Sequence, residues 1–335
     1  MQRLLFLTAI ISLWLNCAAA VSQQAFFPNR NNDVLNAPFS WNNVETVFAF
    51  GDSYTNIVGE YGSIWTWDHF YKEGTVLRNP IIRGASTASG PNWIEYLTGC
   101  LEGLPQNCTP SLFDLAYGGA TVDGSLIPPV FAHIRDLRAQ IQEWQSFIKP
   151  AVSWSTENTL VIVWIGINDI SNSRQMTDQD LSFADEVRLY MRILDVYMKQ
   201  LEVLYDEGLR QFMLLNVPPM DRAPSDKPHA AWFRQAIAIY NALLRRYLDK
   251  FRRTHRGVRV LAVNAHAYFE SYLDHAAAYG FKDIENYCGS TSDPCLPRYQ
   301  YFWNNGAHPT YPVHKILADD ICNNILQNFS GCDIH

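Results

Sequence analysis

Ser53 is the first residue whose type and position could perform chemistry. It follows the apolar run 47–50 and the pair Gly51-Asp52, and a short apolar run that ends at glycine predicts a buried strand. A serine just past such a strand is expected at a strand-to-helix turn, with its hydroxyl facing a cleft and its backbone N–H able to stabilise an oxyanion. The simpler interpretation is that Asp52 or Ser53 only caps a helix, and the tripeptide alone favours it.

Two further motifs follow predicted strands. Gly118-Gly119 comes after a strand expected at 112–117, and glycine lets the backbone approach a ligand closely and offer its N–H. Asn168 follows a strand expected at 159–165 and would present a side-chain amide N–H in the same crevice, as a third oxyanion donor. A tight turn and an Asn-Asp helix cap are the respective alternatives.

His308 could supply the base. It stands in a loop just before the last predicted helix, where Pro309 fixes the local backbone. A lone histidine is more often a surface or packing residue, but a late loop can reach back over the crevice. Together with Ser53 it would form the hydroxyl–imidazole pair of an acyl-transfer site.

An alternation of strand and helix patterns must position these residues. Besides the three strands named above, strands are expected at 212–217 and 258–263, and helices at 92–101, 131–148, 186–205, 230–253 and 312–326. Strands that are apolar throughout are covered on both faces, so the pattern predicts a parallel sheet in a three-layer α/β/α sandwich. In such sheets chemistry occurs beyond the carboxyl ends of the strands.

Composition predicts one folded domain over residues 44–335, preceded by a polar arm at 21–43. The 335-residue chain is 48% hydrophobic and only 18% charged, which argues against disorder. The formal net charge of −7 argues against nucleic acid or an anionic membrane as the main partner. We expect a monomer.

The first 20 residues are typical of a secretory signal peptide, which predicts a secreted protein. Arg3 precedes the apolar run 4–15, and Ala18-Ala19-Ala20 supplies a cleavage site. The run is too short to span a bilayer, so no stable membrane anchor is expected. Lipidation of Cys17 is the weaker alternative, because Leu15-Asn16 before it are not small residues.

The remaining six cysteines form three sequence-local pairs, in agreement with export. The proposed disulfides are Cys100–Cys108, Cys288–Cys295 and Cys322–Cys332, although spacing alone does not prove this connectivity. A metal site is the alternative, but no Cys-x-x-Cys or Cys-x-x-His cluster exists. Asn107 and Asn328 match N-glycan acceptor motifs, and a bridged Cys108 could block the first.

Taken together, the motifs resemble those of the SGNH hydrolases, also called GDSL esterases and lipases. Gly51-Asp52-Ser53 is similar to the nucleophile block, with Tyr54 where leucine is common. Gly119, the segment Gly166-Ile167-Asn168-Asp169 and His308 are similar to the other three blocks. The segments 216–219 and 308–314 further resemble fungal carbohydrate acetylesterases of carbohydrate esterase family sixteen.

The resemblance covers nearly the whole mature chain. It implies a flavodoxin-like SGNH fold with a mostly parallel five-stranded sheet and neither a metal nor an organic cofactor. It also implies hydrolysis of short-chain carboxylic esters, especially acetyl groups on carbohydrates, so the partner would be a small-molecule or oligosaccharide ester. A lipid or general acyl esterase is the alternative.

Asn305 departs from the family pattern, which places an aspartate three residues before the histidine. An amide can present a donor or an acceptor. A donor facing His308 would hold the wrong tautomer, whereas the carbonyl oxygen would hold the right one and lose only the charge. We predict a working Ser53–His308 dyad with Asn305 as a neutral orienter. The rival hypothesis is a catalytically weakened relative that binds carbohydrate.

Overall fold

The computed structural model describes residues 39–60, 74–175, 182–291 and 294–326. The predicted signal peptide and most of the predicted arm lie outside these ranges. Of the arm, residues 39–43 are described, and Phe39 is already buried in the core. The packed chain therefore begins at or before Phe39, ahead of the boundary predicted at residue 44.

The centre of the molecule is a five-stranded parallel sheet, which confirms the prediction. Across the sheet the strands run β4 (Ser111–Asp114), β1 (Thr46–Gly51), β5 (Thr159–Trp164), β6 (Gln211–Leu215) and β7 (Arg259–Val263). Every residue of β1, β5 and β6 is buried, which explains why these segments are apolar without alternation. In chain order the strands are second, first, third, fourth and fifth, the flavodoxin-like order.

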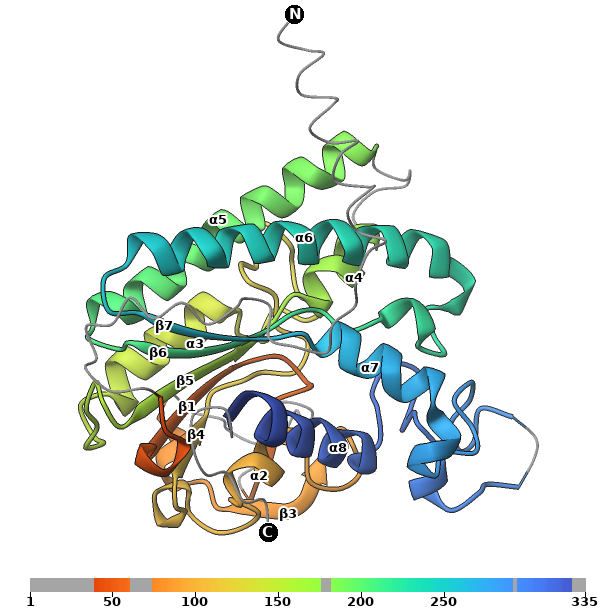
Figure 1. Cartoon of the computed structure of the whole chain (residues 1–335), viewed down its shortest axis with the longest axis horizontal. Helices are drawn as coiled ribbons and strands as arrows, with labels where there is room; N and C mark the ends of the chain where they lie inside the picture. The colour runs from red at the N-terminus through yellow and green to blue at the C-terminus, as the bar shows by residue number, and fades with distance from the viewer. Residues whose placement is uncertain (1–38, 61–73, 176–181, 292–293, 327–335) are drawn as a thin grey trace, which may run out of the picture.

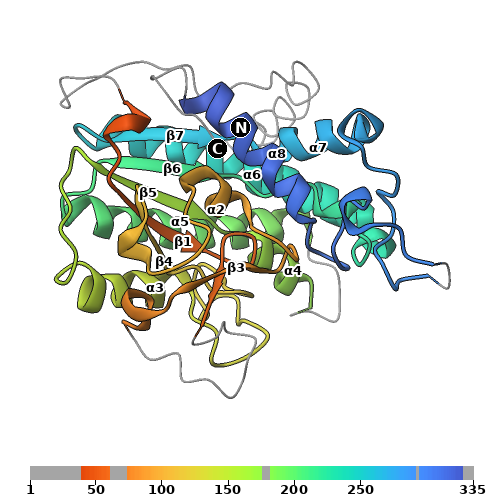
Figure 2. The ribbon, with the colours of Figure 1, turned by 90° about the horizontal axis from the view of Figure 1, so that it is seen from below.

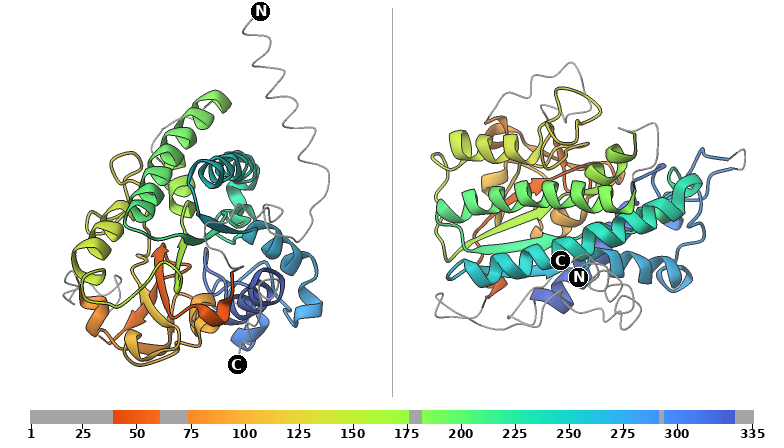
Figure 3. Two further views of the ribbon diagram at one scale, coloured as in Figure 1. Left: turned by 60° about the vertical axis from the view of Figure 1, so that its left-hand side comes forward. Right: turned by 90° about the horizontal axis from the view of Figure 1, so that it is seen from above.

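Helices cover both faces of the sheet and complete the three predicted layers (Figures 1 and 3). One layer contains α3 (Leu137–Glu143), α4 (Ile167–Gln175), α5 (Phe183–Asp206) and α6 (Ala230–Thr254). The other contains α2 (Trp93–Thr98), α7 (Ala265–Asp274) and α8 (Tyr311–Ile321), and Figure 2 views the molecule from that side. The long helix α5 buries side chains at helical spacing, including Tyr190, Ile193, Leu194 and Tyr197.

Several local elements differ from the sequence-based expectation. The helix expected at 131–148 begins only at Leu137, because the Asp136 side chain accepts the Ala139 N–H at 2.8 Å and caps it there. The antiparallel pair β2 (Ile57–Gly59) and β3 (Ile81–Ser86), and the helices α4 and α7, were not predicted. Short 3₁₀ helices occupy Trp41–Asn43, Thr75–Arg78, Pro105–Asn107, Met220–Arg222, Lys227–His229, Ala276–Tyr279 and Arg298–Gln300, and π-helical turns occupy Trp144–Ile148 and Cys322–Leu326.

Two of the proposed disulfides are present, Cys100–Cys108 and Cys288–Cys295. Cys322 is also disulfide-bonded, and its proposed partner Cys332 lies outside the described residues. Each observed bridge closes a loop of 7 or 8 residues. Among the helices of the described ranges, none combines the length and the apolar character that a bilayer crossing requires.

Candidate active site

The sheet order reverses between β1 and β5, and ligands of such sheets bind beyond the carboxyl ends of the strands at that point. Ser53 follows β1 by two residues, and Asn168 follows β5 by four. On the other side of β1, the chain after β4 continues to pair, because the Tyr117 N–H donates to the Gly51 carbonyl at 2.9 Å. That pairing carries Gly119 to the same edge of the sheet.

Ser53 lies in a tight turn between β1 and β2, so the strand-to-helix turn expected for it was wrong. The Asp52 carbonyl accepts the N–H groups of Thr55 and Asn56 at 3.1 and 2.9 Å, and its carboxylate accepts the Tyr54 N–H at 3.0 Å. These local bonds reverse the chain into β2 before a helix can start. The helix-cap interpretation of Asp52 and Ser53 fails for the same reason.

Residues far away in the sequence fix this turn. Thr87 donates its hydroxyl to the Ser53 carbonyl at 2.8 Å, and the Asn92 amide donates to the Thr55 carbonyl at 2.7 Å. The buried Gln140 amide exchanges two hydrogen bonds with Gly51, at 2.9 and 2.8 Å. Sequence reasoning missed these side chains as supports of the site. Of these side chains only Asn92 could have been recognised from the sequence, because Asn92 and Glu95 have the spacing of a capping box, and they form that of α2.

His308 meets Ser53 across 255 positions of sequence. Its Nε2 lies 2.7 Å from Ser53 Oγ, within reach for proton transfer. The loop that carries His308 precedes α8, as predicted, and closes on itself where the Asn304 N–H donates to the His308 carbonyl at 2.7 Å. Buried Tyr54 braces this loop by donating its hydroxyl to the Ala307 carbonyl at 2.6 Å.

The Asn305 side chain presents its carbonyl oxygen to the imidazole. Oδ1 accepts the backbone N–H groups of Ala307 and His308, both at 2.9 Å. An amide nitrogen has no lone pair with which to accept those two donors. The orientation of the amide is therefore fixed, and Oδ1 lies 3.0 Å from His308 Nδ1. His308 then carries its proton on Nδ1, which leaves Nε2 free to accept the Ser53 proton.

Three groups are candidate oxyanion donors, namely the backbone N–H groups of Ser53 and Gly119 and the side-chain amide of Asn168. Within the described residues no acceptor is found for the backbone N–H groups of Ser53 and Gly119. Gly119 has φ of +78°, a conformation that favours glycine. Asn168 donates one amide hydrogen to the Ala120 carbonyl at 2.9 Å, which fixes the orientation of the amide and leaves a second hydrogen to donate.

Asp169 links the two loops that carry these donors. Its buried carboxylate accepts the Val122 N–H at 3.0 and 3.2 Å, and so ties the segment after Gly119 to the first turn of α4. Burial raises the pKa of Asp169 to about 7. The carboxyl group thus links the segments that carry Gly119 and Asn168.

Electrostatics keep His308 neutral. Burial lowers the pKa of His308 to about 4, because an imidazolium loses its hydration there and no charge compensates for the loss. Burial also raises the pKa of Tyr54 well above its usual value, so the phenol stays protonated and keeps its bond to the loop. At neutral pH the imidazole is therefore in the form that can accept a proton.

The other predicted sites are outside the catalytic edge. Asn107 is exposed beside the bridged Cys108, so its glycosylation stays a prediction, and Asn328 lies outside the described residues. In the part of the chain that the structure describes, no group of three or more His, Cys, Asp or Glu residues could hold a metal ion. The geometry provides a hydroxyl, a neutral imidazole and oxyanion donors, which together can carry out acyl transfer.

Comparisons with known proteins agree with this chemistry. A family model described as GDSL-like lipase/acylhydrolase matches residues 47–321. An acetylesterase of Thermothelomyces thermophilus is 28% identical over 287 residues, which cover 82% of this chain and 86% of that protein. A GDSL esterase/lipase of Arabidopsis thaliana is 24% identical over 331 residues, which cover 87% of this chain and 92% of that protein. A solved acetylxylan esterase of Geobacillus stearothermophilus is 18% identical, the alignment covers 84% of this chain and 93% of that chain, and the TM-score is 0.43.

Proposed function

Because the chain belongs to the GDSL-like lipase/acylhydrolase family and is a carboxylic ester hydrolase, we propose that it is a secreted esterase of short-chain esters in which Ser53 is the nucleophile and His308 the base. One observation carries this proposal, the 2.7 Å contact between Ser53 Oγ and His308 Nε2. A protein that only binds carbohydrate has no need of this contact or of the adjacent oxyanion donors.

The reaction proceeds in two halves. His308 Nε2 takes the proton of Ser53 as Oγ attacks the ester carbonyl carbon, and the carbonyl oxygen becomes an oxyanion. The Ser53 N–H, the Gly119 N–H and the Asn168 amide bind that oxyanion, and each such donor is typically worth about 3 kcal/mol of barrier. His308 then protonates the departing alcohol. In the second half it deprotonates a water that releases the acid and restores Ser53.

Asn305 acts here as a neutral orienter. By accepting a hydrogen bond from Nδ1–H it selects the tautomer whose Nε2 lone pair faces the Ser53 hydroxyl. It does not stabilise the imidazolium by charge, so we expect slower turnover than an aspartate would give.

Because Asn305 carries no charge, burial keeps the pKa of His308 low. Since neutral His308 is the active form, activity should persist below pH 6 and be lost as the pH falls toward that lowered pKa.

We expect Asn305→Asp to raise turnover and to move the acidic limb of the pH profile upward. A carboxylate can accept the same three N–H groups and adds a charge beside the imidazole. An opposite charge at this distance raises a pKa by about 1 to 3 units. Replacing a neutral acceptor with a charged one gains about 1 to 2 kcal/mol, or roughly 5- to 30-fold in rate. The measurement is kcat against pH with 4-nitrophenyl acetate.

Asn305→Ala is the matched control for that variant. It removes the acceptor of Nδ1 and of two backbone N–H groups, so its turnover should fall where that of Asn305→Asp rises. If Asn305→Asp is no faster and its acidic limb does not move, Asn305 does not orient His308 in the proposed way.

Acetyl groups on carbohydrates are the proposed substrate. The acetylesterase of Thermothelomyces thermophilus supports this choice by its name and its coverage of both chains. A lipid or general acyl esterase is the alternative, because the relative from Arabidopsis thaliana is named an esterase/lipase. The decisive experiment compares kcat/KM for acetylated xylo-oligosaccharides, ethyl acetate, 4-nitrophenyl acetate and 4-nitrophenyl octanoate.

We expect kcat/KM for 4-nitrophenyl acetate to exceed that for 4-nitrophenyl octanoate by about tenfold or more, since one pocket distinguishes acyl groups by about 10- to 200-fold. A preference for octanoate would support the lipid alternative instead. A kcat/KM for the acetylated sugar no higher than that for ethyl acetate, whose alcohol is also a poor leaving group, would remove carbohydrate from the proposal and keep the short acyl group.

Secretion is part of the same proposal. Two short-loop disulfides are typical of proteins that fold in an oxidising compartment. The predicted signal peptide at 1–20 would deliver the chain there. An exported enzyme would meet polymeric and oligomeric carbohydrate esters, which agrees with the proposed substrate.

A further inference from the structure

Ile134 lies against the oxyanion donor Gly119. An ideal Cβ placed on Gly119 would lie 2.8 Å from Cδ1 of Ile134, so this side chain covers the open side of the glycine. Ile134 is half-buried and belongs to the loop before α3. The Asp136 carboxylate stiffens the loop by accepting the N–H groups of Gly124 and Ala139, both at 2.8 Å. Ile134 is thus a fixed apolar wall beside the reaction centre.

The geometry of the tetrahedral intermediate indicates which part of the substrate lies beside Ile134. The carbon bound to Ser53 Oγ carries an oxyanion, the alcohol oxygen and the acyl chain. The alcohol oxygen must face His308, which protonates it, and the oxyanion faces its donors. His308 precedes α8 on one face of the sheet, whereas Ile134 precedes α3 on the opposite face (Figures 1 and 2). On this assignment the acyl chain occupies the side of the site away from α8, where Ile134 lies beside Gly119.

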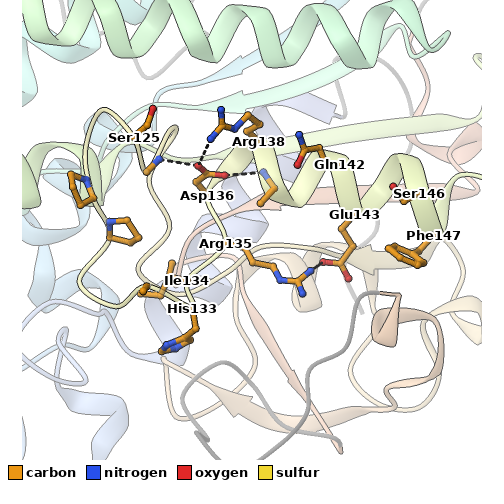
Figure 4. A pocket seen from close by; sticks show the side chains of 15 residues that line it. Ser125, His133, Ile134, Arg135, Asp136, Arg138, Gln142, Glu143, Ser146 and Phe147 are labelled. Atoms are coloured by element: carbon orange, nitrogen blue, oxygen red, sulfur yellow. Dashed lines mark hydrogen bonds and ion pairs between the residues drawn. The ribbon is translucent and has the colours of Figure 1, made fainter.

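Ile134 also lines a pocket whose lining includes none of Ser53, Gly119, Asn168 and His308. It has a volume of about 1080 Å³ and runs from the loop 124–136 along α3 to Phe147. Figure 4 shows Ile134 at the loop end of this pocket, with Glu143, Ser146 and Phe147 at the opposite end. Pro128, Pro129 and Ala132 also line it. The lining is mixed, because Arg135, Asp136, Arg138, Gln142 and Glu143 line the pocket as well, and its volume exceeds that of a six-carbon acyl chain.

We propose that Ile134 determines acyl-chain specificity by separating the ester site from this pocket. The isoleucine leaves room for an acetyl group beside Gly119 and blocks the path of a longer chain into the pocket. This inference rests on the proposed function and specifies which side of the site restricts the acyl group. It concerns only the acid part of the ester and is independent of the alcohol.

The test measures kcat/KM for 4-nitrophenyl acetate and 4-nitrophenyl hexanoate in the wild-type full-length protein, Ile134→Ala and Val130→Ala. Val130 belongs to the same loop, is 64% exposed and does not line the pocket, so it is the matched β-branched control. Ile134→Ala should raise the hexanoate-to-acetate ratio by about tenfold or more. The acetate value of Ile134→Ala should stay within a few-fold of wild type, and Val130→Ala should keep the wild-type ratio.

Two outcomes overturn the inference while the proposed function stands. One is an unchanged ratio in Ile134→Ala, and the other is an equal loss on both esters, which would mean that Ile134 only orders Gly119. A rise in the ratio for Val130→Ala as well would assign the effect to loosening of the loop and also overturn it. If the wild-type protein hydrolyses neither ester, the proposed function itself fails and the inference fails with it.

Discussion

Ser53→Ala should abolish ester hydrolysis, with a loss of turnover of about 10⁶-fold, by comparison with serine hydrolases in which nucleophile and base act as a unit. The reason is geometric. Ser53 Oγ lies 2.7 Å from His308 Nε2, which is positioned to take its proton, and alanine leaves the ester carbonyl with water as its nucleophile. The oxyanion donors remain, so a residual rate of about 10³ over water is expected.

The measurement combines hydrolysis of 4-nitrophenyl acetate with labelling by a fluorophosphonate. The wild-type protein should gain one covalent adduct on Ser53, and Ser53→Ala should gain none at the same melting temperature. Ser146→Ala replaces an exposed serine on the π-helical turn after α3 and is the matched control, with wild-type activity and labelling. Equal hydrolysis by wild type and Ser53→Ala would remove Ser53 from the mechanism.

His308→Ala should produce a loss nearly as large as that of Ser53→Ala. Without the imidazole, nothing accepts the Ser53 proton or returns it to the leaving alcohol, and a neutral serine hydroxyl is a weak nucleophile. Residues that act as a unit are strongly non-additive. The double variant Ser53→Ala/His308→Ala should therefore be no slower than either single variant.

A comparison with His275→Ala controls for the loss of a histidine. His275 is exposed at the end of α7, and its replacement should leave kcat unchanged. If the losses in the double variant multiply, Ser53 and His308 contribute independently and the proton-transfer pair is wrong. A His308→Ala variant with near wild-type turnover would point to a different base.

The strands were predictable because they are buried on both faces. Each of the five predicted strands overlaps an observed one, and β1, expected at 47–50, spans Thr46–Gly51. Continuous apolar sequence is what a parallel strand between two helical layers requires. Once the strands were placed, topology alone predicted that Gly119 and Asn168 follow their carboxyl ends, near Ser53.

The local structure around Ser53 was not predictable from its neighbours in sequence. The turn depends on Thr87 and Gln140, which contact residues 34 and 89 positions away. The hydrogen bond that the Asp52 side chain accepts from the Tyr54 N–H then competes successfully with helix formation. Tyr54, a departure from the common leucine, acquires its role only through the Ala307 carbonyl, 253 positions later.

The chemical groups, their order along the chain and the strands that end beside them can all be read from the amino-acid sequence. How those groups face one another depends on the packing of the folded chain. The amide of Asn305 illustrates the reason, because its orientation depends on two backbone donors whose positions exist only after the loop has folded. The wall formed by Ile134 on Gly119 is likewise a contact between two loops, and side-chain contacts of that kind depend on how the chain packs.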